Sequence, residues 1–187
     1  MATIIPLAIV ALVLVLLVMM LLKSKKGQSA QCSKPKGNIY RDLRDKPFSL
    51  KPEEIGITSE DSKTPFGALM EFAYPEVTIS VVAFSDGNAS MYFSSGGAAI
   101  GGYAHESIVE AAKAFVASTK KFLPQMQLTT DFSLPKPGEV FFYVLTESGV
   151  YRANAIESEL EQKKTPLWEL YFGAHAIISA YREISGG

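Results

Sequence analysis

A glycine-rich segment is the part of this 187-residue chain best suited by composition to hold a small ligand. It reads Ser-Ser-Gly-Gly-Ala-Ala-Ile-Gly-Gly over residues 94–102, between an expected strand and an expected helix. Such an arrangement brings free backbone N–H groups and a helix N-terminus toward an anion. The resulting anion pocket would be lined by Gly96, Gly97, Gly101, Gly102 and His105.

A structural role is the competing interpretation of this glycine segment, and the one that we favour. Glycines let a backbone bend, bulge or pass close beneath a neighbouring element. The segment also lacks the G-x-G-x-x-G spacing of dinucleotide sites and the Gly-Lys-Ser/Thr ending that reaches nucleotide phosphates. We therefore expect no cofactor.

The residues that could perform catalysis do not form a known pattern. His105 and Glu106 begin the expected helix without the H-E-x-x-H spacing of zinc proteases, and His175 stands alone on another helix. Ser94 or Ser95 with His105 would resemble a hydrolase triad, but the G-x-S-x-G elbow is missing. A hydrolase is accordingly our third hypothesis, and no catalytic residue is assigned.

Composition argues against metal and nucleic-acid sites. One cysteine excludes a disulfide framework and any site built from several thiolates. Glu157, Glu159 and Glu161 alternate with other residues, which predicts a solvated face rather than a magnesium site. The net charge of −1 is not that of a nucleic-acid-binding protein. We expect no metal and no nucleic-acid partner.

The N-terminus has the composition of a membrane anchor. All but two of the first 22 residues are apolar and none is charged, whereas Lys23, Lys25 and Lys26 follow directly. A helix of about 20 residues spans the hydrocarbon core of a bilayer, so the pattern predicts a single transmembrane helix over residues 1–22. A cleaved signal peptide is the alternative, which the missing basic start disfavours.

Charge predicts the orientation of this anchor. Residues 23–46 carry eight basic and two acidic side chains, a net charge of +6, whereas 10 basic and 17 acidic residues follow from Pro47 onward, a net charge of −7. The positive-inside rule places the short N-terminus outside and the rest in the cytoplasm. Candidates for contact with anionic lipid headgroups are Lys23, Lys25 and Lys26. The alternative is that these lysines serve only to set the orientation of the anchor in the membrane.

Residues 23–63 are expected to be a basic, proline-containing linker, with one helical turn over residues 51–56. From residue 64 to 187 the pattern is that of an α+β domain. Two β-hairpins are predicted, over residues 77–95 and 140–155, each followed by an amphipathic helix, one over 105–122 and one starting at Thr165. Strand 140–146 is apolar on both faces and should lie centrally. Residues 68–74 are a weaker strand candidate that a helical turn would also fit.

The order hairpin, helix, hairpin, helix over residues 77–184 resembles the roadblock, longin and profilin-like group of small cytoplasmic domains. The resemblance implies an antiparallel sheet with two packed helices, and a non-catalytic domain that pairs with itself or docks other protein subunits. It transfers no binding residue. The sequence thus favours a membrane-anchored accessory or assembly subunit of a membrane complex. The alternative is a tethered sensor of a small ligand or anion that uses residues 96–102.

Overall fold

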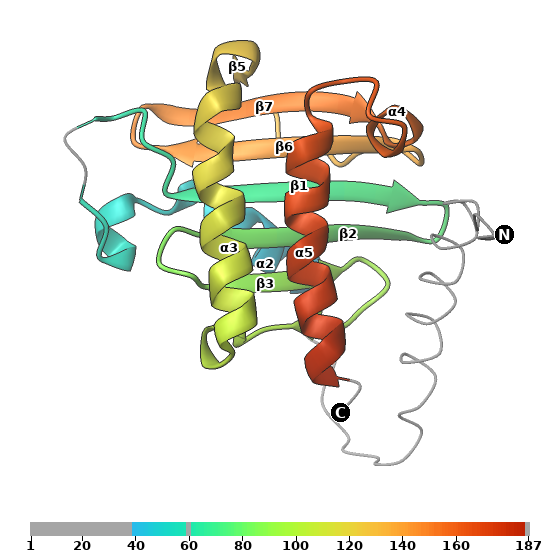
Figure 1. Ribbon diagram of the computed structural model, residues 1–187, viewed down its shortest axis with the longest axis horizontal. Helices are drawn as coiled ribbons and strands as arrows, with labels where there is room; N and C mark the ends of the chain where they lie inside the picture. Colours follow the sequence, from blue (N-terminus) through green and yellow to red (C-terminus); the bar gives the residue numbers. More distant parts are fainter. Residues whose placement is uncertain (1–38, 59–60, 186–187) are drawn as a thin grey trace, which may run out of the picture. The chain divides into compact units, whose positions relative to one another are not determined.

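A seven-stranded antiparallel sheet forms the centre of the computed structural model, which describes residues 39–58 and 61–185 (Figure 1). Its strand order is β4-β3-β2-β1-β6-β7-β5. The strands are β1 Gly67–Tyr74, β2 Val77–Phe84, β3 Ala89–Phe93, β4 Ala98–Ala99, β5 Gln127–Leu128, β6 Glu139–Thr146 and β7 Gly149–Ile156. Both predicted hairpins, β2–β3 and β6–β7, are confirmed, and the weak candidate at residues 68–74 is strand β1.

Two long helices cover one face of the sheet, α3 (Glu106–Thr119) and α5 (Trp168–Ser185) (Figure 1). Their apolar stripes recur every three or four residues, so each helix buries one side against the strands. Ile108 and Phe115 of α3 pack with Leu170 and Ile177 of α5 in the larger apolar core. Both helix predictions are confirmed.

Strand β6 lies between β1 and β7 and is buried from Val140 to Thr146. Because side chains alternate along a strand, Phe142 enters the core beneath the helices, whereas Tyr143 enters a second apolar cluster on the opposite face. The prediction of a central strand covered on both sides is confirmed.

The cover on that opposite face comes from the beginning of the described chain. It consists of α2 (Ile39–Asp45) and the 3₁₀ turns η1 (Lys46–Ser49) and η2 (Pro52–Ile55). The sequence predicts a linker here, and only the turn at η2, which ends at Gly56 with φ +72°, matches its prediction. The apolar residues that contact the second cluster here are Tyr40, Leu43 and Phe48. Helix α2 has only 7 residues, which is too few for a helical repeat of apolar residues to be recognised in the sequence.

The described residues, from 39 onward, accordingly belong to one compact unit, which includes residues well before residue 64. The predicted transmembrane helix over residues 1–22, and Lys23, Lys25 and Lys26 behind it, lie outside the described residues. Within residues 39–58 and 61–185, no helix has both the length and the apolar character needed to cross a membrane.

Candidate functional site

The glycine segment connects the edge of the sheet to α3. Gly96 and Gly97 turn the chain from β3 into β4 with φ of +103° and +99°, and Gly101 begins the 3₁₀ turn η3 (Gly102–Ala104) with φ +89°. These are left-handed backbone conformations that residues other than glycine rarely adopt. His105 then caps α3 through its backbone, with its side chain exposed.

Gly102 is glycine because of space rather than backbone angle. A Cβ atom placed there would lie 2.5 Å from Cγ2 of Ile108 and 2.7 Å from the hydroxyl of Tyr181. That hydroxyl donates a 2.7 Å hydrogen bond to the carbonyl of Ala89, which joins the end of α5 to the start of β3. The close approach predicted for these glycines therefore occurs at Gly102, where the chain passes beneath two side chains.

Several backbone N–H groups of this segment already have partners. Gly96 donates to Phe93, Ala104 to Gly101 and His105 to Gly102. Glu106 also places a carboxylate in the first turn of α3, where a bound anion would profit from the helix dipole. The candidate anion pocket thus has fewer free donors than its sequence indicates.

The segment presents two bulky apolar side chains to solvent. Ile100 is 66% exposed and Tyr103 is 71% exposed, although both lie within two residues of the buried Gly102. Ile100 and Tyr103 lie on either side of Gly101 and Gly102 in the chain, directly after β4. Strand β4 is short and pairs with β3 only at Met91 and Tyr92. The glycines were predicted from the sequence as a candidate site, but Ile100 and Tyr103 were not, because glycine spacing alone carries no signal for exposed apolar side chains.

A buried ion pair lies on the face of the sheet opposite α3 and α5. Arg44 of α2 is 2% exposed and Glu71 of β1 is 0% exposed. Nε of Arg44 donates to Oε1 of Glu71 at 2.7 Å, and Nη2 donates to Oε2 at 2.5 Å. This two-bond geometry matches the planar guanidinium to the carboxylate, which is the strongest form of such a pair.

The remaining polar atoms around this pair are also bonded. Ser80, opposite Glu71 in the β1–β2 register, donates to the carboxylate at 2.7 Å and lies 3.0 Å from the hydroxyl of Tyr40. Burial raises the pKa of Tyr40 to about 12, so its hydroxyl keeps a proton to donate. Nη1 of Arg44 donates to the carbonyl of Phe132 and to Asp45.

Aromatic rings enclose the guanidinium of Arg44. Its Cζ atom lies 4.8 Å from the ring centre of Phe48 and 5.8 Å from that of Tyr143. Phe48 is stacked on Phe132 with ring centres 4.2 Å apart. Arg44 is therefore held by charge, hydrogen bonds and ring faces together, and its role is to fasten α2 to the sheet.

A second ionisable cluster lies beneath α5. Oε1 of Glu157, at the start of the short helix α4 (Glu157–Glu161), accepts hydrogen bonds from the hydroxyls of Tyr171 at 3.2 Å and Tyr74 at 3.3 Å. Burial raises the pKa of Glu157. The predicted solvated face of alternating acids forms only in part. Glu159 is exposed, whereas the helical turn that buries Leu160 leaves Glu157 half-buried against the two tyrosines.

His175 packs between Phe72 of β1 and Tyr171, with ring centres 5.7 and 4.4 Å away. Its Nε2 atom is buried without a hydrogen-bond partner among the described residues. Burial lowers the pKa of His175 to about 4, so the ring is neutral at pH 7. The structure thus places His175 in a packed interface. Oγ of Ser94 accepts a 2.8 Å hydrogen bond from the backbone N–H of Thr78.

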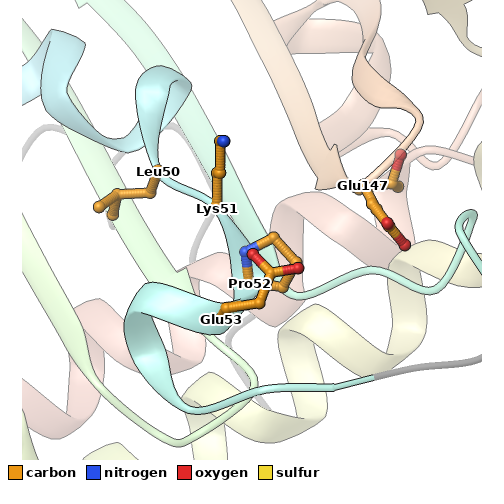
Figure 2. Close-up of a pocket in the computed structure, with 6 residues that line it drawn as sticks. Leu50, Lys51, Pro52, Glu53 and Glu147 are labelled. Carbon is orange, nitrogen blue, oxygen red and sulfur yellow. The ribbon is translucent and has the colours of Figure 1, made fainter.

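Two open hollows lie beside η2. One, of about 380 Å³, is lined by Leu50, Lys51, Pro52, Glu53, Thr146 and Glu147 (Figure 2). The other, of about 170 Å³, adjoins it at Pro52, Glu53 and Glu147. Neither is lined by the glycine segment or by either histidine, and no three His, Cys, Asp or Glu side chains of the described chain are grouped to hold a metal ion.

Comparison with known proteins returns no relative: no family model, no curated protein and no solved structure matches this chain.

Proposed function

We propose that this chain is a membrane-anchored, non-catalytic protein-docking domain, an accessory or assembly subunit of a membrane complex. Ile100 and Tyr103 form its docking surface, and their exposure on a backbone held by Gly102 is the observation that carries the proposal. Exposed aromatic side chains on a rigid support are typical anchors at protein interfaces. The roadblock, longin and profilin-like order of elements supports the same assignment.

The ionisable side chains support docking rather than catalysis. Arg44 and Glu71 are saturated with hydrogen bonds inside the fold, and His175 is packed between two rings. A general acid or base must reach a substrate, and these groups face the interior.

A photo-crosslinking amino acid in place of Tyr103 tests the docking surface in the full chain, in its own cell. We expect one discrete protein adduct. The same amino acid at Lys136, an exposed position on another part of the domain, is the matched control. Adducts of equal number and yield at both positions would contradict the proposal.

Substitution provides the second measurement. Replacing Ile100 and Tyr103 together with Ser should leave the unfolding temperature nearly unchanged, because exposed side chains away from the core contribute little to stability. The partner that purifies with the wild-type chain in mild detergent should be lost. Retention of that partner by the double variant would show that it docks elsewhere.

The anchor and its orientation have their own test. Because the basic residues follow the apolar run, a reporter fused after Gly187 should face the cytoplasm. Protection of the reporter on the far side of the membrane would overturn the cytoplasmic assignment and favour secretion.

A further inference from the structure

The part of the chain that carries the docking surface, Ile100 and Tyr103, is acidic. Residues 64–112 form β1 to β4, η3 and the first half of α3, and they contain no Lys or Arg. Glu71 is buried in this range. The other acidic side chains of the range are all exposed, and they are Glu76, Asp86, Glu106 and Glu110.

Two of these acids follow Tyr103 along one side of α3. Tyr103 belongs to η3, which leads directly into α3, and side chains three or four residues apart lie on the same side of a helix. Glu106 and Glu110 have no ion-pair partner among the described residues. Helices α3 and α5 contain one basic residue each, Lys113 and Arg182. The carboxylates beside the docking surface are therefore available to a partner.

The described chain also begins at this edge of the sheet. Helix α2 packs against β3, and the hydroxyl of Tyr40 lies 3.0 Å from Oγ of Ser80. Ser80 is opposite Tyr92 of β3, and Tyr92 is opposite Ala98 of β4, just before Ile100. The chain that leads from the predicted anchor therefore enters the domain at the edge that carries the docking surface.

We propose that the partner at this surface is a basic segment of another membrane protein, in which Lys and Arg side chains flank an apolar residue. Ile100 and Tyr103 contact the apolar residue, and Glu106 and Glu110 pair with the cations. Short cytoplasmic segments next to membrane-spanning helices are rich in Lys and Arg, so they have this composition. The inference rests on the proposed docking function and names the chemical class of its partner.

The same charges disfavour two other occupants. An anionic bilayer surface attracts Lys and Arg but repels carboxylates, so lipid headgroups do not complement Glu106 and Glu110. A second copy that docked through the same surface would place these acids against themselves, because a two-fold interface joins identical patches. Like charges brought together at an interface oppose association, whereas opposite charges favour it.

Synthetic peptides test the charge preference on the full chain in a non-ionic detergent. The probe is a short fluorescent peptide with lysines around two central leucines, and the matched peptide carries glutamate in place of each lysine. Fluorescence polarisation should detect saturable, salt-sensitive binding of the lysine peptide and no binding of the glutamate peptide. E106Q/E110Q should weaken binding roughly three- to tenfold, as expected for two surface ion pairs.

A matched variant separates this site from general attraction to an acidic domain. E147Q/E159Q removes two exposed carboxylates on other parts of the domain and should leave binding nearly unchanged. Equal weakening in both double variants would overturn the proposal. The same result, together with loss of the natural partner in I100S/Y103S, would refute the basic partner but leave the docking function standing.

The natural partner provides the second measurement, through the crosslinked adduct at Tyr103. Sequencing should place the adduct in a Lys- or Arg-rich stretch beside an apolar run long enough to span a membrane. E106K/E110K should abolish the adduct at a nearly unchanged unfolding temperature, because exposed charges contribute little to stability. An adduct that persists in E106K/E110K, or that lies in an acidic segment or in a second copy of this chain, would overturn the proposal.

Discussion

The two faces of the sheet bury ionisable groups in opposite ways. On the face covered by residues 39–49, here called the strap face, Arg44 and Glu71 are joined by two hydrogen bonds. Ser80 also donates to the carboxylate of Glu71, and the carbonyl of Phe132 accepts from Arg44. On the helix face, His175 is buried with Nε2 unpartnered among the described residues. The strap face keeps its charges by pairing them, whereas the helix face accommodates His175 by keeping it neutral.

Each face is therefore vulnerable to a different change. A paired buried charge resists pH but fails when one partner is removed, because the other is left buried and alone. An unpaired neutral histidine tolerates replacement by an apolar residue but responds to acid.

Removing one partner on the strap face should have the largest effect. Arg44→Ala leaves the Glu71 carboxylate without its main partner, and we expect a loss of about 3–5 kcal/mol in the free energy of unfolding. Replacing both with apolar residues of similar size, Arg44→Met with Glu71→Leu, should cost far less. Urea denaturation measures the unfolding free energy of both variants. If both lose the same amount, the contacts of Arg44 with the aromatic rings contribute more to stability than its ion pair with Glu71.

Acid should act next most strongly, and on the helix face. The pKa of His175 is about 4 in the folded chain against 6.5 ordinarily, so the unfolded chain binds the proton more readily. Stability should therefore fall as pH drops from about 6.5 toward 4, by at most about 3 to 4 kcal/mol, since one pKa unit is worth about 1.4 kcal/mol.

The variant His175→Leu isolates this contribution. Its unfolding free energy should fall less than that of the wild type over the same pH range, and the difference between the two curves should level off below pH 4. Glu157 acts in the opposite direction, because its raised pKa makes protonation favour the folded state. Parallel curves for wild type and variant would rule out His175 as the acid-sensitive group.

Two glycines provide a smaller contrast. A methyl group at Gly102 would overlap Ile108 and Tyr181 on the helix face, so Gly102→Ala should cost about 1–3 kcal/mol through overpacking. Gly96 has φ +103° and open space around it, so Gly96→Ala should cost only the backbone strain, about 1 kcal/mol. Phosphate should leave both melting temperatures unchanged, whereas a saturable increase that Gly96→Ala abolishes would support the anion pocket.

The smallest effect is expected at Glu157. Glu157→Gln keeps an acceptor oxygen for Tyr74 and Tyr171 but removes a charge that burial disfavours. The variant should be slightly more stable than the wild type at pH 7 and should lose that advantage in acid. Calorimetry at pH 7 and at pH 4 measures both, and a destabilised variant at pH 7 would show that the tyrosine hydroxyls require the carboxylate.

Local patterns in the sequence were enough for much of this architecture. Alternation defined β2 and β3, and a run apolar on both faces defined β6 with its hairpin partner β7. The three-to-four spacing of apolar residues defined α3 and α5, and Pro52 with Gly56 defined η2. These elements carry their signal within a few consecutive residues, because the period of burial is the period of the backbone itself. The composition of residues 94–102 likewise identified a backbone that needs glycine.

Only the tertiary structure decided which side chains meet. Arg44 and Glu71 are 27 residues apart and Tyr74 and Glu157 are 83 apart, so no local period connects them. Arg44 looked like one more linker charge, and Glu157 like one more solvated acid, because charged residues are mostly exposed. Strand register and helix packing override this tendency toward exposure, because they place a partner within hydrogen-bond distance of each buried charge. Neither strand register nor helix packing is encoded in any short stretch of the chain.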